Sequence, residues 1–227
     1  MDRKLQQIKN TPYFTYLFLA IQTAVFILAF LFPRLQLEFR GAVFGPSIAY
    51  FQEYWRFVTP IFIHYGLMHF AVNSVVLYFM GQQVESLYGH WRFFIIYIFS
   101  GIAGNVLGFA FNPPMVQAAG ASTSLFGLFG AFVILGIYYK DNYAIRGMVR
   151  QFTLFLAMNL IFGFLDQSVD ILGHVGGLIG GVLLGNIMGL PKSLKDYSIH
   201  IRILSGIIYI AFIIFCLLYG FRKYSSF

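Results

Sequence analysis

Long apolar stretches separated by short polar connections run along almost the whole chain. They predict transmembrane helices, because a bilayer core needs about 20 consecutive apolar residues in each helix. The longest connection, Pro33 to Pro60, is amphipathic and contains Trp55 and Arg56, so we expect it to lie in the membrane interface. The fifth apolar stretch is the shortest of the set. The predicted spans are Phe14–Phe32, Ile61–Met80, Phe93–Phe111, Ser122–Tyr139, Phe152–Leu165, Ile171–Leu190 and Ile203–Gly220.

The composition supports this interpretation. Of the 227 residues, 59% are hydrophobic and only 10% are charged, whereas an ordinary soluble domain has about 25% charged residues. A soluble fold of this length would expose too much apolar surface, and seven spans leave no room for a sizeable soluble domain. The fold class that follows is an all-α polytopic membrane protein. Its single cysteine, Cys216, cannot form an intrachain disulfide.

The basic residues predict the topology. The net charge is +7, and the Lys and Arg residues lie in short loops, which indicates membrane orientation and contact with anionic lipids rather than nucleic-acid binding. With the N-terminus in the cytosol, the inner loops hold Arg3, Lys4, Lys9, Arg92, Lys140, Arg146, Arg150, Lys192, Lys195 and Arg202. The outer loops then hold Arg34, Arg40, Arg56, Arg222 and Lys223. We therefore expect a multi-pass protein of the plasma membrane with a cytosolic N-terminus and an outer C-terminus.

Polar side chains gather in three of the predicted spans. Polar groups inside a bilayer are costly, so they need an explanation. The second span carries His69 and Asn73, the fourth opens with Gly120 to Ser124, and the sixth carries His174. In the predicted topology these three helices all begin at the outer face. At 1.5 Å per residue, the clusters lie at similar depth, within about 15 Å of that face.

These residue types fit peptide hydrolysis. Ser122 is a candidate nucleophile and His174 a candidate general base, because a neutral histidine near pH 7 can take a serine proton. His69 and Asn73 are four residues apart and share a helix face, where they can donate to an oxyanion. The backbone at Ala121 and Ser122 is a further oxyanion candidate, since N–H groups in the first turn of a helix are unpaired. We expect the resulting cavity to open to the extracellular side.

The spacing of small residues predicts how these helices pack. Glycines recur every four residues in the sixth span, and such a smooth stripe lets another helix approach closely. The fourth span offers Gly127, Gly130 and Ala131 as partners, and Phe126 lies one turn below Ser122, where it can stack on His174. The stripe consists of Gly173, Gly177, Gly181, Gly185 and Gly189.

Each signal also has an ordinary structural explanation. A serine in a span often bonds to its own helix, a histidine and asparagine pair can join helices, and glycines allow packing. His64 is expected to be turned away from His69 and structural, and His90 is expected to be solvated in a loop. It is the coincidence of the three clusters at one depth that favours a reactive site.

These motifs resemble the rhomboid family of intramembrane serine proteases, in a bacterial form with a seventh helix after a six-helix core. The family's Gly-x-Ser motif is matched at Gly120-Ala121-Ser122, although Thr123 stands where glycine is usual and narrows the space beside Ser122. The other matches are His174 with Gly177, His69 with Asn73, Trp55-Arg56, Glu85 after the second helix, and Phe126 where tyrosine is common.

The resemblance implies a Ser–His dyad that needs no metal or cofactor and cuts membrane proteins in or next to a transmembrane helix. It divides the chain into a cytosolic segment (1–13), a catalytic core (14–190), and a loop with the seventh helix (191–227). Glu85, Trp55, Arg56, Gly173 and Gly181 take structural roles, and Phe126 and Gly177 support the dyad.

Other membrane functions leave different signatures. A zinc protease would show His-Glu-x-x-His, and an aspartyl protease would show two acids within its spans. A transporter would show inverted repeats. None of these patterns is present in the sequence. The main alternative is a non-catalytic rhomboid-like protein that binds client helices, but such relatives usually lack the serine or the histidine that this chain keeps.

Overall fold

The computed structural model describes residues 11–165, 170–189 and 198–225. Most of the predicted segment 1–13, the loop 166–169 and the basic residues Lys192 and Lys195 lie outside these ranges. The elements, in chain order, are α2 (Tyr13–Leu31), η1 (Pro33–Leu35), α3 (Leu37–Gly41), β1 (Val43–Phe44), α4 (Gly45–Phe51), η2 (Tyr54–Phe57), η3 (Thr59–Phe62), α5 (Gly66–Val76), the π-turn η4 (Leu77–Gly81), α6 (Gln82–Tyr88), α7 (His90–Phe111), β2 (Gln117–Ala118), α8 (Ser122–Tyr138), α9 (Tyr143–Leu165), α10 (Ile171–Met188) and α11 (Ile199–Ser225).

Every predicted span overlaps a helix in the described residues, which confirms the all-α polytopic fold. Four helices there are long and apolar enough to cross a membrane, namely α2, α7, α10 and α11, and α8 is apolar but shorter. The chain is therefore a multi-pass membrane protein. The prediction of an all-helical chain missed one small element, an antiparallel ribbon in which Val43 of β1 pairs with Ala118 of β2.

Two predicted boundaries were wrong. The second span begins at Gly66 rather than Ile61, because Gly66 has a φ of +79° and the separate turn η3 ends at Phe62, with three non-helical residues between them. The fifth helix begins at Tyr143, nine residues before the predicted start. The side chain of Asn142 accepts the N–H groups of Ala144 and Ile145, so it caps a first turn that is too polar to read as a span.

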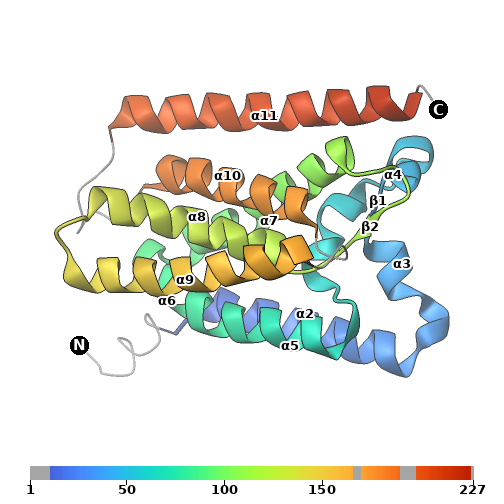
Figure 1. The fold of residues 1–227 in the computed structure, drawn as a ribbon, viewed down its shortest axis with the longest axis horizontal. Coiled ribbons are helices and arrows are strands. Elements are labelled where there is room, and N and C mark those ends of the chain that lie inside the picture. The colour runs from blue at the N-terminus through green and yellow to red at the C-terminus, as the bar shows by residue number, and fades with distance from the viewer. Residues whose placement is uncertain (1–10, 166–169, 190–197, 226–227) are drawn as a thin grey trace.

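The helices form a bundle whose centre is α7, α8 and α10 (Figure 1). Helix α10 packs against both α7 and α8, while α9 packs mainly on α8. Helix α11 lies along α7 and α10 on one side of the bundle, and α2 and α5 lie on the opposite side (Figure 1). Helices α5, α8 and α10 all begin at the same end of the bundle, on the right in Figure 1, as the predicted topology requires.

The long connection before α5 is tied down by Arg56, which is 2% exposed. Its guanidinium donates to the carbonyl oxygens of Phe39 and Ala42 at 2.7 and 2.8 Å and pairs with Glu53 at 2.5 Å. Trp55 donates its Nε1–H to the carbonyl oxygen of Arg40 at 3.4 Å. The end of the connection is therefore hydrogen-bonded to its middle, around residues 39–42.

The last helix fastens this connection to the bundle. The ring of Tyr224 stacks on Phe109 of α7 with 5.4 Å between ring centroids, and Tyr50 of α4 donates its hydroxyl to the carbonyl oxygen of Tyr224. Lys223 donates to the carbonyl oxygen of Asn112 at the end of α7. The end of α11 thus holds α4 against the end of α7.

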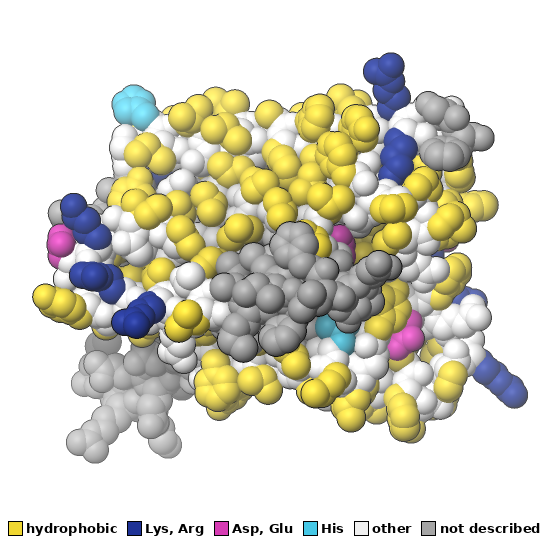
Figure 2. Space-filling view, viewed as in Figure 1, with side chains coloured by type: hydrophobic (Ala, Val, Ile, Leu, Met, Phe, Trp, Pro, Cys, Tyr) yellow, Lys and Arg dark blue, Asp and Glu magenta, His cyan; other side chains and the backbone are white. Residues whose placement is uncertain are grey.

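The surface fits a membrane environment. Outside the atoms drawn in grey, hydrophobic side chains are spread over the face shown in Figure 2, whereas Lys and Arg side chains lie towards its two ends. Among the exposed apolar residues are Phe30 of α2, Ile137 of α8, and Ile207 and Leu218 of α11. An apolar belt with basic ends is the distribution that a bilayer selects.

Candidate active site

Ser122 is the first residue of α8, and the loop before it is fixed by two hydrogen bonds. The N–H of Gly120 donates to the carbonyl oxygen of Pro60 at 2.9 Å, and the N–H of Ala121 donates to Nε2 of His64 at 3.3 Å. Gly120 has a φ of +141°, a conformation that other residues rarely adopt. The serine hydroxyl is therefore presented by a rigid turn at the start of a helix.

His174 lies directly beside this hydroxyl. It is the fourth residue of α10, and its Nε2 is 2.8 Å from Oγ of Ser122. The imidazole stacks on Phe126, with 4.1 Å between ring centroids and 11° between the planes. Its side chain is buried, with 7% exposed, and its Nδ1 has no hydrogen-bond partner in the part of the chain that the structure describes. The stacking holds the ring in the orientation in which Nε2 faces the serine.

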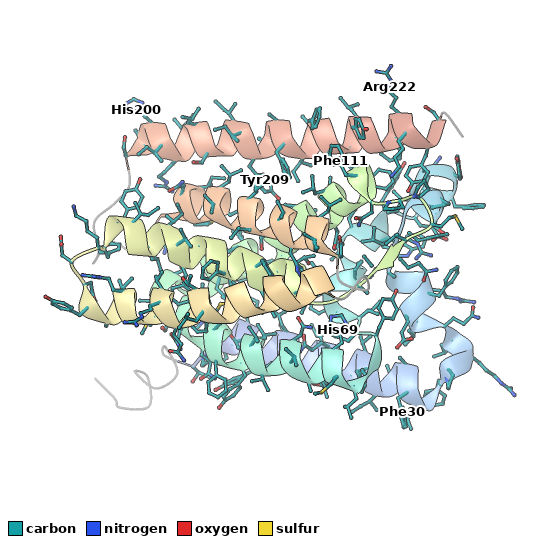
Figure 3. All side chains as sticks on the ribbon, in the orientation of Figure 1. Phe30, His69, Phe111, His200, Tyr209 and Arg222 are labelled. Carbon is teal, nitrogen blue, oxygen red and sulfur yellow. The ribbon has the colours of Figure 1, made fainter. Side chains whose placement is uncertain are left out.

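His69 and Asn73 border the same place. A methyl group added to Gly120 would lie 2.7 Å from Nε2 of His69 and 3.4 Å from Oγ of Ser122, so both groups flank this glycine. Figure 3 shows His69 projecting from α5 towards the inside of the bundle. Asn73 is buried one turn further along α5, and its Nδ2 donates to the carbonyl oxygen of His69 at 2.8 Å. The second amide hydrogen of Asn73 remains available to a ligand.

One predicted oxyanion donor is already engaged. The N–H of Ala121 has His64 as its acceptor, so it is not free to bind an oxyanion in this structure. The sequence analysis placed His64 on the helix, where five residues would turn it about 140° away from His69 around the helix axis. In the structure His64 precedes the helix, and its ring contacts that of His69 with centroids 5.2 Å apart.

The glycine stripe of α10 brings the two helices together. A Cβ on Gly177 would lie 2.0 Å from the carbonyl oxygen of Thr123, and a Cβ on Gly181 would lie 1.9 Å from that of Gly127. Because these contacts are with backbone atoms, a side chain at either glycine would push α10 away from α8. The distance between His174 and Ser122 therefore depends on both glycines.

Thr123 does not narrow the space beside Ser122 in the way expected from the sequence. It is 4% exposed, and its Cγ2 lies 3.0 and 3.1 Å from where a Cβ on Gly104 or Gly173 would be. The side chain thus fills the contact between α7, α8 and α10. Its hydroxyl is buried without a hydrogen-bond partner among the described residues.

Asp170 is a neighbour that sequence reasoning treated only as a loop residue. It caps α10 by accepting the N–H of Gly173 at 2.8 Å, and it also accepts from Nδ2 of Asn112 at 3.0 Å. Burial raises the pKa of its carboxyl, although these two hydrogen bonds act in the opposite direction. An Asp directly before an apolar run is a helix N-cap signal, so the pattern could have identified this role.

Glu85 lies outside the site, within the short helix α6. Its carboxylate is 1% exposed and accepts from the N–H groups of Phe14 and Thr15 at 3.0 and 2.8 Å, and from the Thr15 hydroxyl at 2.7 Å. Nδ1 of His90 lies 2.6 Å from the same carboxylate. His90 is therefore not the solvated loop residue expected from the sequence, because it begins α7 next to a buried acid.

Comparison with known proteins places most of the chain in one family. The family model of the rhomboid domain matches residues 52–191. The chain is 35% identical over 225 residues to rhomboid protease GluP of Bacillus subtilis, which covers 94% of this chain and 42% of that protein. It is also 30% identical over 166 residues to Rhomboid-like protease 3 of Toxoplasma gondii, covering 72% of this chain and 62% of that protein. The chain thus spans less than half the length of GluP.

Proposed function

Because the chain belongs to the rhomboid family, we propose that it is an intramembrane serine endopeptidase. It hydrolyses peptide bonds in or next to the transmembrane segments of other membrane proteins. The observation that carries this proposal is the contact of 2.8 Å between Nε2 of His174 and Oγ of Ser122. It joins the first turns of two helices that are far apart in sequence, between a half-buried hydroxyl and a buried imidazole.

The reaction begins with proton transfer from Ser122 to His174. The neutral imidazole accepts the hydroxyl proton on Nε2, so its own proton is on Nδ1. Oγ then attacks the substrate carbonyl and forms a tetrahedral intermediate. The imidazolium returns the proton to the leaving amine, and a water molecule hydrolyses the acyl enzyme by the same sequence of transfers. The stacked ring of Phe126 keeps the imidazole in place through both steps.

The negative oxygen of the intermediate needs hydrogen-bond donors. We assign this role to the N–H of Ser122, the Nε2–H of His69 and the second amide hydrogen of Asn73. The position of His69 next to Gly120 and the burial of Asn73 support the assignment. Ala121 is left out because its N–H is bonded to His64. Donors fixed in this way stabilise the transition state without rearranging.

The membrane topology is part of the proposal. We place the protein in the plasma membrane with a cytosolic N-terminus, residues 14–190 as the catalytic core, and the site open to the extracellular side. The excess of basic residues in the predicted inner loops supports this orientation. The common end at which α5, α8 and α10 begin supports a single reactive face (Figure 1). The proposed substrates have transmembrane helices that unwind readily, because a peptide bond in a helix is shielded from attack.

The test is proteolysis in liposomes. The wild type is compared with Ser122→Ala and His174→Ala on a model substrate whose transmembrane segment contains glycine. We expect each substitution to lower the cleavage rate by at least about 10³-fold, because nucleophile and base act as a unit. A serine-reactive fluorophosphonate probe should label the wild type and not Ser122→Ala.

Ser124→Ala is the matched control. Ser124 is buried two residues further along α8, and its hydroxyl has no hydrogen-bond partner within the described ranges. This variant should cleave and label like the wild type. Unchanged cleavage by Ser122→Ala would overturn the assignment of the nucleophile. A folded wild type that neither cleaves nor labels would favour the client-binding function instead.

A further inference from the structure

A hollow lies between α8 and α9 near the end of the bundle opposite to Ser122. Its volume is about 310 Å³. Ser122 begins α8 and Ile137 lies close to its other end, so about 22 Å of helix separates the two. The hollow is thus remote from the proposed catalytic groups. It is lined by Val133, Gly136 and Ile137 of α8 and by Arg146, Val149 and Arg150 of α9.

The walls of the hollow are apolar and accessible from outside the bundle. Gly136 allows α9 to approach closely, since a Cβ there would lie 3.0 Å from Cγ2 of Val149. Ile137 is 63% exposed on the rim. In a membrane protein such a rim faces lipid, so a hydrocarbon chain can enter the hollow without displacing protein.

The two arginines supply charge without an internal partner. Arg146 and Arg150 are one turn apart on α9, and both are exposed. Neither guanidinium has a hydrogen bond or ion pair with any described residue. Like charges at this spacing repel each other, so an anion between them is favourable. Basic side chains lie at this end of the molecule, on the left of Figure 2, next to hydrophobic ones.

The depth of the arginines matches a lipid headgroup. They are the fourth and eighth residues of α9, within about 12 Å of its start. Long basic side chains at such a helix end reach towards the interface, and basic pockets between transmembrane helices bind anionic headgroups. Lys140 lies in the connection just before α9 and adds a further positive charge.

We infer that this hollow binds one anionic phospholipid, with its phosphate between Arg146 and Arg150. An acyl chain lies against Val133, Ile137 and Val149. A free phosphate would contact only the two guanidiniums and would leave the apolar wall uncovered. A phospholipid would contact the guanidiniums with its phosphate and the apolar wall with its acyl chain. The bound lipid joins α9 to α8 at one end. This matters for α9, because in the part of the chain that the structure describes it packs mainly on α8.

Binding can be measured on the delipidated wild-type protein in detergent. Phosphatidylglycerol, phosphatidylcholine and sodium phosphate are titrated separately, and bound lipid is counted by native mass spectrometry. Phosphatidylglycerol should bind, with phosphatidylcholine at least tenfold weaker and phosphate unable to compete at equal concentration. In Arg146→Gln/Arg150→Gln the affinity for phosphatidylglycerol should fall about 25-fold, or about fivefold for each arginine.

Arg34→Gln/Arg40→Gln is the matched control, with the same change of charge at the other end of the bundle. It should retain the wild-type affinity. Ile137→Asn tests the apolar wall and should weaken phosphatidylglycerol binding by severalfold. Equal affinity of the Arg146/Arg150 variant and the wild type would overturn the inference. Competition by phosphate would also overturn it, because the site would then take a free anion. The readout is binding, so it stands apart from the test of Ser122.

Discussion

Replacing Gly181 with alanine tests whether the approach of α10 to α8 limits both stability and activity. The added Cβ would lie 1.9 Å from the carbonyl oxygen of Gly127, whereas ordinary contact begins at 3.4 Å. Helix α10 must therefore withdraw by about 1.5 Å, the difference between the two distances. The obstructing atom is backbone, so no flexible side chain can move aside.

The magnitude follows from two opposing effects. Overpacking of a tight contact costs about 3 kcal/mol at the upper end of its usual range. Alanine in place of glycine stabilises a helix by about 1 kcal/mol, because less conformational entropy is lost on folding. The net loss is about 2 kcal/mol, which lowers the melting temperature of a chain of this size by roughly 4–8 °C.

Activity should fall by more than stability alone predicts. His174 lies two turns before Gly181 on the same helix, and its contact with Ser122 is 2.8 Å. A displacement of the order of 1 Å takes the base out of hydrogen-bond range and costs about 100-fold in rate. The measurements are thermal unfolding in detergent and the liposome cleavage assay.

Gly206→Ala is the control for this experiment. Gly206 lies in α11, and a Cβ there would meet nothing within 4 Å. This variant should melt at or slightly above the wild-type temperature and keep full activity. The reasoning would be refuted if Gly181→Ala were as stable and as active as Gly206→Ala.

Three further changes address other contacts. Glu85→Gln should lower the free energy of unfolding, measured with a chemical denaturant, by about 3 kcal/mol. A neutral amide cannot replace a buried carboxylate that accepts several donors. The control Glu38→Gln, at a half-buried acid, should change the free energy of unfolding by less than about 0.5 kcal/mol. Phe126→Ala should lower the cleavage rate about two- to tenfold through loss of the stacked ring, and Phe126→Tyr should not; equal rates for both would contradict the role of the stack. The raised pKa of Asp170 means that the folded state holds this proton more tightly than the unfolded state, so stability falls as the pH rises above 3.8 and through the raised value. Both samples carry the Ser122→Ala substitution as a common background. Melting curves at several pH values should show this fall in the Ser122→Ala protein. They should not show it in Ser122→Ala/Asp170→Asn, in which asparagine still caps α10.

Local sequence predicted the helices well where their ends are marked by composition. The start of α8 at Ser122 and the start of α10 at Ile171 match the predicted spans, because Gly120 lies two residues before the first and Asp170 directly before the second. The start of α9 was missed by nine residues. Hydropathy measures preference for lipid, and Arg146 and Arg150 lower it without interrupting the helix.

The pairing of Ser122 with His174 could be anticipated because both residues lie at the start of helices that run in the same direction. The role of His64 could not be anticipated, since it depends on where a helix begins. Five residues along a helix would turn His64 away from His69, but α5 begins only at Gly66, whose φ is positive, so His64 precedes the helix and its ring contacts that of His69. Backbone geometry at one glycine thus places His64 where it accepts the N–H of Ala121.

The sequence by itself determined that the chain is a membrane protein of several helices, with serine, histidine and asparagine at one depth. Hydropathy, charge and helical periodicity are local properties, so they can be read without coordinates. Only the tertiary structure decided which atoms meet. The contact of Nε2 of His174 with Ser122, the occupation of the Ala121 N–H by His64, and the burial of Thr123 against Gly104 all depend on close packing between distant segments. Backbone contacts at glycine set the distances between these segments to within a few tenths of an ångström. Residue type and spacing along the chain do not predict distances that closely.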